Sequence, residues 1–503
     1  MSRQHLCVPV VTAGPLAIHT GDQAAGEDTM LGVSADGRPV LPGTSVAGAL
    51  RAAAQRRYGA PQADALFGRL VTNESERSER VERGMLTGEP SRITVFDATA
   101  STATEGQFRH RVGIDRATQA AKRGILFDQR VWPQGLRFDL RFECDDADLG
   151  LLRGAIEELL GPAGGIGAGA CPLAPADTDD ETHAATIGPT TFFGAEAVAQ
   201  AAERWNEPST TQWPSTTEPC TTPAQPPDEV PGWIRIDLVF RLSGPLASRV
   251  PIDVASASEH DNVPFVVEDL LTGTPRRAVG YPGTSFKGRL RQRAEYLCAV
   301  TGRPAPDPWD TDGGAVHPVQ AAFGHAPGGR AEDAAEGAAG RVRCSDLLAG
   351  YADPTHGFAP TWSEEPAEAH PLVIVRDRVA VDRLAGSTYT SAKFDDTVVR
   401  DGAWLAGTIS IVPHLGEELD DTDLALVIAG LRDLATGRIG LGGSTHSGYG
   451  DVELIHGRIR ERHGAQERTA DLKPTVDNPV GLPQDLAQRV RDAWARTRQG
   501  AAA

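Results

Sequence analysis

Lysine, long apolar runs and closely spaced cysteines are all nearly missing from this sequence of 503 residues. Only four of its 49 basic residues are lysine, so the choice of arginine at any one position carries little information. No segment approaches the roughly 18 consecutive apolar residues of a membrane span, and residues 1–11 lack the pattern of a secretory signal. The six cysteines form no C-x-x-C pair, which speaks against a zinc knuckle or a disulfide framework. We therefore expect a cytoplasmic protein with no membrane partner.

Acidic side chains exceed basic ones by 68 to 49, which gives a formal net charge of −19. On that balance alone a polyanionic partner would be unexpected. The excess is local, however, because residues 171–230 hold ten acids and one base, and residues 304–337 hold six acids and one base. Both segments have the composition of loops. The remainder of the chain is close to neutral and can carry basic surfaces.

The two halves of the sequence share five landmarks in the same order. The matched segments are 14–16 with 244–246, 41–51 with 281–291, 66–68 with 322–324, 114–116 with 381–383, and 127–128 with 394–395. Chance explains such a series poorly, so we infer a duplicated unit with different loop insertions.

Each half has the pattern of an α+β fold in the order β-α-β-β-α-β. The expected helices are 45–58 and 146–160 in the first half, 285–300 and 421–434 in the second, and 485–498 near the end. The order predicts two tandem ferredoxin-like (RRM-type) domains with loop insertions. The predicted divisions are a first domain at 1–170, a Pro/Thr-rich acidic linker or insertion at 171–230, a second domain at 231–456, and a polar C-terminal tail with one helix at 457–503.

A Pro-Gly-Thr-Ser turn precedes the first predicted helix of each half. A helix that begins in such a turn presents free backbone N–H groups, which suit a phosphate. The plainer interpretation is a capped amphipathic helix with solvated arginines, but its recurrence in both halves favours a function. The candidate phosphate-binding residues on these helices are Ser45, Arg51, Ser285, Lys287 and Arg291.

Two other repeated elements are candidates for ligand contact. An Asp-Arg pair ends at Arg116 and again at Arg383, each followed at the same spacing by Phe-Asp, which indicates a shaped loop rather than an ordinary surface ion pair. A glycine-rich segment that contains Gly448 and Tyr449 lets the chain approach a ligand closely. It is neither a Walker A motif nor a dinucleotide fingerprint.

Acidic residues lie in the loop before each Pro-Gly-Thr-Ser turn, among them Asp28 and Asp261. A carboxylate beside a bound phosphodiester can place a divalent ion or orient an attacking 2′-hydroxyl. Ordinary surface acids in a polar loop are the plainer interpretation of the residues alone.

Taken together, these motifs resemble the RAMP superfamily of CRISPR-associated proteins, and most of all the backbone subunits of type III effector complexes. The motifs that carry the resemblance are P-G-T-S-F-K-G-R-L-R at 282–291, its degraded copy at 42–51, L-F-G at 66–68, I-D-R at 114–116, and the ending G-G-S-T-H-S-G-Y-G at 442–450. A chain with two such units resembles the fused double backbone subunits of some type III variants. Unit one lacks the family lysine in its helix and the G-Y-G ending.

The resemblance implies an RRM-like domain that binds guide CRISPR RNA within a multisubunit antiviral complex. It implies that a loop aspartate in each unit, Asp28 and Asp261, cleaves complementary target RNA with a divalent metal, Mg²⁺. The residues listed above would then contact RNA, and the other partners would be target RNA and further effector subunits. A non-catalytic scaffold of the same complex is one alternative. A guide-processing ribonuclease with His19 as general base is another.

Overall fold

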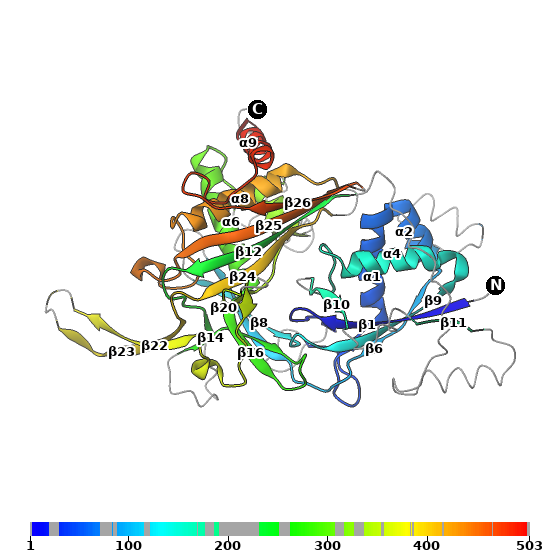
Figure 1. Ribbon diagram of the computed structural model, residues 1–503, viewed down its shortest axis with the longest axis horizontal. Helices are drawn as coiled ribbons and strands as arrows, with labels where there is room; N and C mark the ends of the chain where they lie inside the picture. Colours follow the sequence, from blue (N-terminus) through cyan, green and yellow to red (C-terminus); the bar gives the residue numbers. More distant parts are fainter. Residues whose placement is uncertain are drawn as a thin grey trace. The chain divides into compact units, whose positions relative to one another are not determined.

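The computed structural model describes residues 3–19, 30–70, 83, 88–114, 121–167, 170–176, 186–190, 231–250, 262–306, 316–325, 337–353, 357–382, 384, 387–414, 417–464 and 466–499. The chain divides into two compact units. Unit 1 comprises Met1–Gln107 and Arg130–Pro231, and unit 2 comprises Phe108–Gln129 and Gly232–Ala503. Both units combine helices and sheet (Figure 1). In the described part of the chain, no helix is both long and apolar enough to cross a membrane.

Unit 1 is built on a small antiparallel sheet with helices. Its main elements are β1 (Arg3–Thr12), β2 (Val40–Leu41), α1 (Gly43–Tyr58), α2 (Ala60–Phe67), β5 (Thr94–Val95), β6 (Ala98–Thr99), β9 (Arg137–Asp145), α4 (Leu149–Leu160), β10 (Leu173–Pro175) and β11 (Thr186–Thr190). The strand order is β10-β1-β9-β5, and β11 also pairs with β1. Because alternate residues of a strand point to the same face, Phe138, Leu140 and Phe142 of β9 are buried together.

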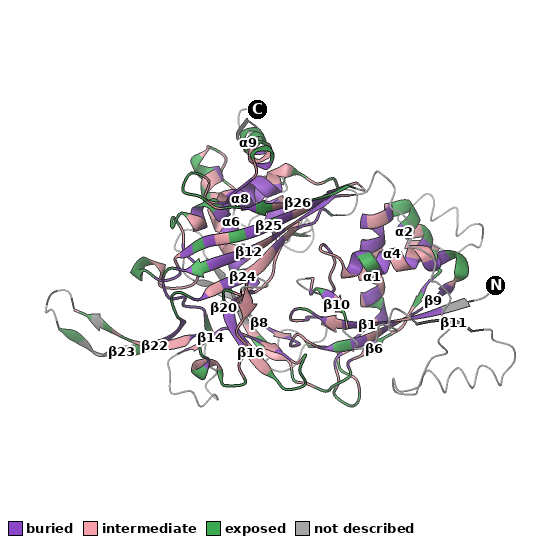
Figure 2. Cartoon of the chain, in the orientation of Figure 1, coloured by how far each residue is buried: buried purple, intermediate pink, exposed green. Residues whose placement is uncertain are grey.

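Unit 2 repeats this arrangement on a larger scale. Its main elements are β12 (Trp233–Leu242), β15 (Val266–Asp269), β16 (Arg276–Tyr281), α6 (Gly283–Val300), α7 (Pro318–Phe323), β19 (Val342–Cys344), β20 (Leu347–Tyr351), β24 (Trp404–Ile411), α8 (Asp421–Ala435), β25 (Val452–His463), β26 (Gln466–Leu472) and α9 (Gln484–Gln499). The sheet runs β15-β16-β20-β24-β12-β25-β26, and β19 also pairs with β24. Phe286 and Leu290 of α6 pack into the core, where the rings of Phe286 and Phe240 meet edge to face. Buried residues run along β12 and α8 (Figure 2).

The predicted helices are present, with shifts at their ends that have a physical cause. The first helix of each unit begins two residues earlier than predicted, at Gly43 and Gly283. Pro42 and Pro282 are the N-cap residues. Proline suits a helix start because no N–H group is needed there for a hydrogen bond within the helix, and its fixed φ leads into the helix. The main elements that the two halves share occur in the same order along the chain, and the second half has further strands and a C-terminal helix.

Two predicted boundaries fall inside the folded units. The segment 171–230 begins within unit 1, because β10 and β11 pair with β1. The C-terminal tail was expected to start at 457, but β25 continues through this point and β26 pairs with it. Helix α9 is then anchored by Arg489, which binds Asp421 at 2.6 Å and Glu461 at 2.8 Å. The polar composition of this tail concealed the strand β26, whereas its helix was predicted.

A two-stranded hairpin surrounds the Asp-Arg motif of each half. In the first half β7 (Gln107–Ile114) and β8 (Ala121–Val131) form one, and in the second β22 (Val373–Val381) and β23 (Thr388–Val399) form the other. The β22–β23 hairpin extends away from the main sheet of unit 2 (Figure 1). Residues Phe108–Gln129 of the first hairpin cluster with unit 2.

Candidate nucleic-acid interface

A carboxylate occupies the start of the first helix in both units. Asp97 accepts a hydrogen bond from the Gly43 N–H at 2.6 Å, and Asp346 accepts one from the Gly283 N–H at 2.8 Å. The charge of such a carboxylate opposes a phosphate at the same place. The first N–H group of each helix is therefore not free for a phosphate, contrary to the prediction.

The glycine of the Pro-Gly-Thr-Ser turn is needed for packing. A Cβ atom at Gly43 would lie 2.4 Å from the carbonyl oxygen of Val95, and one at Gly283 would lie 2.4 Å from that of Cys344. These distances are too short for any side chain, so glycine lets each helix approach the strand that leads to the capping aspartate. The motif is structural at this position in both units.

The candidate arginines on these helices already have partners. Arg51 pairs with Asp64 at 2.5 Å, and Arg291 pairs with Glu295 at 2.8 Å. Arg291 also donates to the Gly324 carbonyl oxygen at 2.9 Å. Of the two candidate serines, Ser45 is half-buried and Ser285 is exposed.

Lys287 is different, because it has no ion-pair partner among the described residues. Burial lowers the pKa of its ammonium group most, Cys344 acts in the opposite direction, and the charges of Arg291 and Arg343 lower the pKa further. Lys287, Arg291 and Arg343 therefore lie close enough together for their charges to interact. Such a cluster attracts an anion. A bound anion would favour the charged form of Lys287, which burial disfavours.

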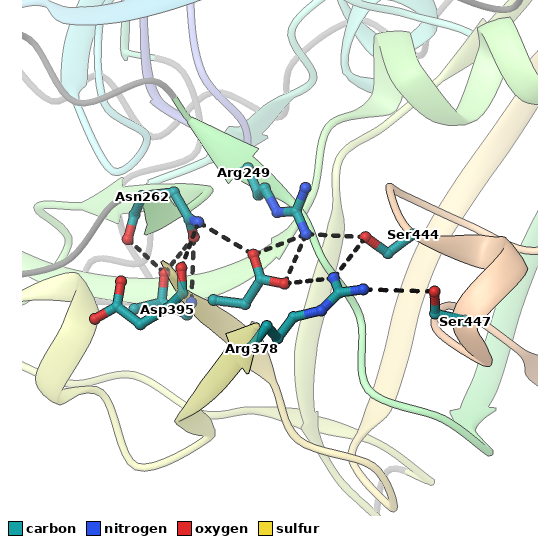
Figure 3. Close-up of polar contacts among 8 residues, drawn as sticks. Arg249, Asn262, Arg378, Asp395, Ser444 and Ser447 are labelled. Atoms are coloured by element: carbon teal, nitrogen blue, oxygen red, sulfur yellow. Dashed lines mark hydrogen bonds and ion pairs between the residues drawn. The ribbon is translucent and has the colours of Figure 1, made fainter. Parts of the chain in front are cut away.

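A second cationic cluster lies around the buried carboxylate of Asp396 on β23 (Figure 3). Arg249 binds this carboxylate at 2.7 Å and Arg378 of β22 binds it at 2.8 Å. Both guanidinium groups also donate to the hydroxyl of Ser444, at 2.9 and 3.1 Å, and Arg378 reaches Ser447 at 3.4 Å. Two partly exposed arginines thus surround one fully buried aspartate, so the cluster carries a net positive charge beside the glycine-rich segment.

This cluster also fixes the residue that follows Asp261. The Asn262 amide donates to Asp396 at 3.2 Å and to the Asp395 carbonyl at 3.3 Å, while its oxygen accepts from Thr397 (Figure 3). Asn262 itself is buried. One hydrogen-bond network around the buried Asp396 therefore joins the hairpin, the glycine-rich segment and the end of the acidic loop.

Several predicted site residues lie outside the described residues, namely Asp28, Arg116, Asp261 and Arg383. Within the described part of the chain no group of three or more His, Cys, Asp or Glu side chains is placed to hold a metal ion. The roles of these residues and of Mg²⁺ stay predictions.

Tyr449 is a buried residue of the glycine-rich segment. It is 6% exposed, and the guanidinium groups of Arg376 and Arg378 lie over its ring at 5.8 and 5.3 Å. Gly448 beside it is exposed and has a φ of +77°. The exposed face of this segment is thus formed by Gly448 and its small neighbours, while the tyrosine supports them.

The described residues of the first half of the sequence form no equivalent of this second cluster. Its glycine-rich loop between Ile166 and Cys171 is four residues long, against eight between Leu441 and Gly450. Glutamine stands at position 129, the equivalent of Asp396, and half-buried His19 stands at the equivalent of Arg249. The His19 Nε2 atom lies 3.4 Å from the Arg130 carbonyl oxygen.

The sequence held a signal for part of this network. The Asp-Arg motif is the end of a longer repeat, R-x-R-V-x-x-D-R, at 109–116 and 376–383. This repeat would have singled out Arg109, Arg376 and Arg378. Asp97 and Asp346 also stand at equivalent positions, but no local pattern connects them to helices more than 50 residues away.

Comparison with known families agrees with the duplication. The family model of the RAMP superfamily matches residues 10–171 and 281–453, which is more than half of the chain. The chain belongs to the RAMP superfamily. A solved chain titled "Type IV-B CRISPR Complex" is 20% identical and covers 48% of this chain and 96% of its own length, at a TM-score of 0.31, and we rest no argument on it. A search of the curated proteins found no match.

Proposed function

We propose that this RAMP protein is a backbone subunit of a CRISPR effector complex and that it binds guide RNA. The observation that carries the proposal is the family match to both halves of the chain. The positive cluster at Lys287 and the Arg249–Arg378 cluster support it, because each offers charge to a phosphate on a chain whose overall charge is −19. Ferredoxin-like layers of the RRM type are part of the proposal, supported by the shared order of helices and strands.

The finer proposal is a type III subunit that cleaves complementary target RNA. Asp28 and Asp261 would act near the scissile phosphate, and a bound Mg²⁺ would stabilise negative charge on the phosphate oxygens. The network around Asn262 supports a role for Asp261, since it fixes the backbone directly after that residue. A carboxylate must be held in place to orient a 2′-hydroxyl for in-line attack.

The test uses the complex purified with its guide RNA and a labelled complementary target. We expect Asp28→Asn and Asp261→Asn each to remove one Mg²⁺-dependent cut and to leave target binding unchanged in a gel-shift assay. Asp377→Asn is the matched control, because Asp377 is 72% exposed and its ion-pair partner among the described residues is the equally exposed Lys393. It should leave both cuts intact.

The other outcomes select the alternatives. Target binding without any cleavage by the unmodified complex would favour the non-catalytic scaffold. Accumulation of unprocessed guide RNA with a His19→Ala chain would favour the processing ribonuclease. Absence of RNA from the purified complex would refute the proposal as a whole.

A further inference from the structure

One buried carboxylate in unit 2 is surrounded by three arginines near the end of α8. Asp433 is fully buried, and Arg293 of α6 binds its Oδ2 atom at 2.6 Å. Arg432 binds the Oδ1 atom at 2.9 Å, and Arg438 binds the same atom at 3.3 Å. Burial would raise the pKa of Asp433, but the hydrogen bonds from Arg293 and Arg432 hold the pKa below its usual value. The group therefore contains one negative and three positive charges.

The described part of the chain does not neutralise this positive charge. Arg289 of α6 adds a fourth guanidinium, which donates to two neutral acceptors, the Gly440 carbonyl oxygen and the Gln292 side chain, each at 2.8 Å. The side chain of Arg438 is 59% exposed, and among the described residues it uses one of its five N–H donors. The name Asp433 cluster is used below for Asp433, Arg289, Arg293, Arg432 and Arg438.

Apolar side chains continue the same side of α6. Arg293, Tyr296 and Val300 follow one another at spacings of three and four residues, so they lie on one side of the helix. The Arg293 guanidinium lies over the Tyr296 ring, 4.5 Å from its centre. Tyr296 is 54% exposed and Val300 is 67% exposed. Exposed apolar residues that adjoin a charged cluster in this way are typical of a protein-binding surface.

This surface lies on the opposite side of α6 from the candidate RNA contact. The helical period places Lys287 and Arg291 on one side of the buried Leu290. Arg289 and Arg293 lie on the other side. One helix can therefore contact two different partners at the same time.

We propose that the Asp433 cluster, with Tyr296 and Val300, binds an acidic amphipathic segment of a partner protein. Carboxylates of the partner would pair with Arg432 and Arg438, and its apolar side chains would cover Tyr296 and Val300. Charge complementarity selects an acidic partner on a chain that is otherwise acidic. The apolar end favours a protein over a nucleic acid, because Val300 offers no polar contact to a phosphate or a base. The proposal does not depend on RNA binding by the chain.

Fluorescence anisotropy with the purified full chain tests the proposal, with a labelled synthetic helix as the probe. This helix carries glutamates in its first turns and leucines at i and i+4 in its last turns. We expect saturable binding, which Arg432→Gln and Arg438→Gln each weaken by about threefold or more, and Tyr296→Ala by about tenfold. Arg458→Gln is the matched control, because Arg458 is 58% exposed and pairs with the exposed Asp471 on the sheet. It should bind the probe like the unmodified chain.

Two further probes separate the proposal from its rivals. A helix with the same glutamates but with serine in place of leucine should bind about fivefold more weakly, because it cannot cover Tyr296 and Val300. Labelled single-stranded RNA should bind Arg438→Gln as it binds the unmodified chain, since its candidate contacts lie on the Lys287 side of α6. Failure of the unmodified chain to bind this RNA would count against the proposed function alone.

Four results would overturn the proposal of a protein partner. They are no binding of the glutamate–leucine helix, an equal loss of binding in Arg458→Gln, equal binding of the serine helix, and a loss of RNA affinity in Arg438→Gln. The last result would assign the cluster to nucleic acid instead. Thermal unfolding confirms that every variant is folded, which we expect because Arg293 still binds Asp433 in each of them.

Discussion

The carboxylate of Asp396 is 1% exposed, yet it remains charged because three groups around it favour the charged form. Burial alone would raise its pKa, but the hydrogen bond from Arg378, the charge of Arg249 and the hydrogen bond from Asn262 hold the pKa below its usual value. If a neutral residue replaced Asp396, Arg249 and Arg378 would lose the carboxylate that they bind while they remain partly removed from water. The cluster is thus a structural element as well as a candidate RNA contact.

We expect Asp396→Asn to lower the free energy of unfolding by about 1–3 kcal/mol at pH 7, less than for a fully buried pair because both arginines are partly exposed. The control is Asp377→Asn on the same hairpin, which should change it by less than about 0.5 kcal/mol. Denaturant unfolding monitored by tryptophan fluorescence measures both. Equal effects of the two substitutions would contradict the special role of Asp396.

The pH dependence of the same variant gives an independent check. Since the pKa of Asp396 is lower in the folded chain than the value of about 3.9 in the unfolded chain, its stabilisation is complete above about pH 5. It is lost as the pH falls through the folded value. The stability difference between the unmodified protein and Asp396→Asn should therefore shrink below about pH 4.

Predictions for single residues were correct where the interacting residues lie in the same motif. They failed where the interacting residue lies far away along the chain. The Pro-Gly-Thr-Ser turns were correctly predicted to begin helices. The first N–H group of each helix is not free as expected, because Asp97 and Asp346, which follow more than 50 residues later in the chain, accept from it. Similarly, Tyr449 stood out in the sequence, but its burial under Arg376 and Arg378 depends on the hairpin.

At the scale of elements, the first helix of each unit contains two glycines with opposite surroundings. Gly43 and Gly283 touch a strand backbone, whereas Gly48 and Gly288 have nothing within 4 Å of a built Cβ. A glycine inside a helix costs about 0.5–1 kcal/mol relative to alanine. Nothing in the described part of the chain explains why glycine stands at both Gly48 and Gly288. This supports the close approach of a ligand to the helix at these positions.

We expect Gly288→Ala to raise the free energy of unfolding by about 0.5–1 kcal/mol and to weaken RNA binding. Gly283→Ala should instead lower it by about 1–3 kcal/mol, because its Cβ would meet the Cys344 carbonyl at 2.4 Å. Thermal unfolding and fluorescence anisotropy with labelled single-stranded RNA measure the two properties separately. Unchanged RNA affinity in Gly288→Ala would show that the open glycine does not serve a ligand.

The elements themselves were largely predictable because local patterns encode them. Alternating apolar residues marked β12, and the repeat fixed which segments correspond. The strand within the predicted C-terminal tail was missed for a different reason. Strand β26 is almost entirely exposed, so its sequence has no apolar alternation, and it is recognised only by its pairing with β25.

At the scale of the whole molecule, duplication followed by divergence has left the two units with unequal charge on equivalent surfaces. Lys287 of α6 corresponds to Ala47 of α1, and the Arg249–Asp396 pair corresponds to His19 and Gln129. If RNA lies along the first helix of each unit, unit 2 supplies most of the phosphate contacts. A pair of reciprocal substitutions can measure this inequality directly.

Lys287→Ala should weaken RNA binding, and Ala47→Lys should strengthen it, because each changes one contact to a phosphate at an equivalent position. For single-stranded RNA, one such contact alters the slope of log affinity against log salt concentration by about 0.7. We expect the slope to become shallower by this amount in Lys287→Ala and steeper in Ala47→Lys, measured by fluorescence anisotropy. Lys473→Ala, at an exposed lysine in a different part of unit 2, is the control and should leave the slope unchanged. If Lys287→Ala behaved like this control, the RNA would not contact α6; if only Ala47→Lys did, the two repeats would hold RNA by different faces in spite of their common fold.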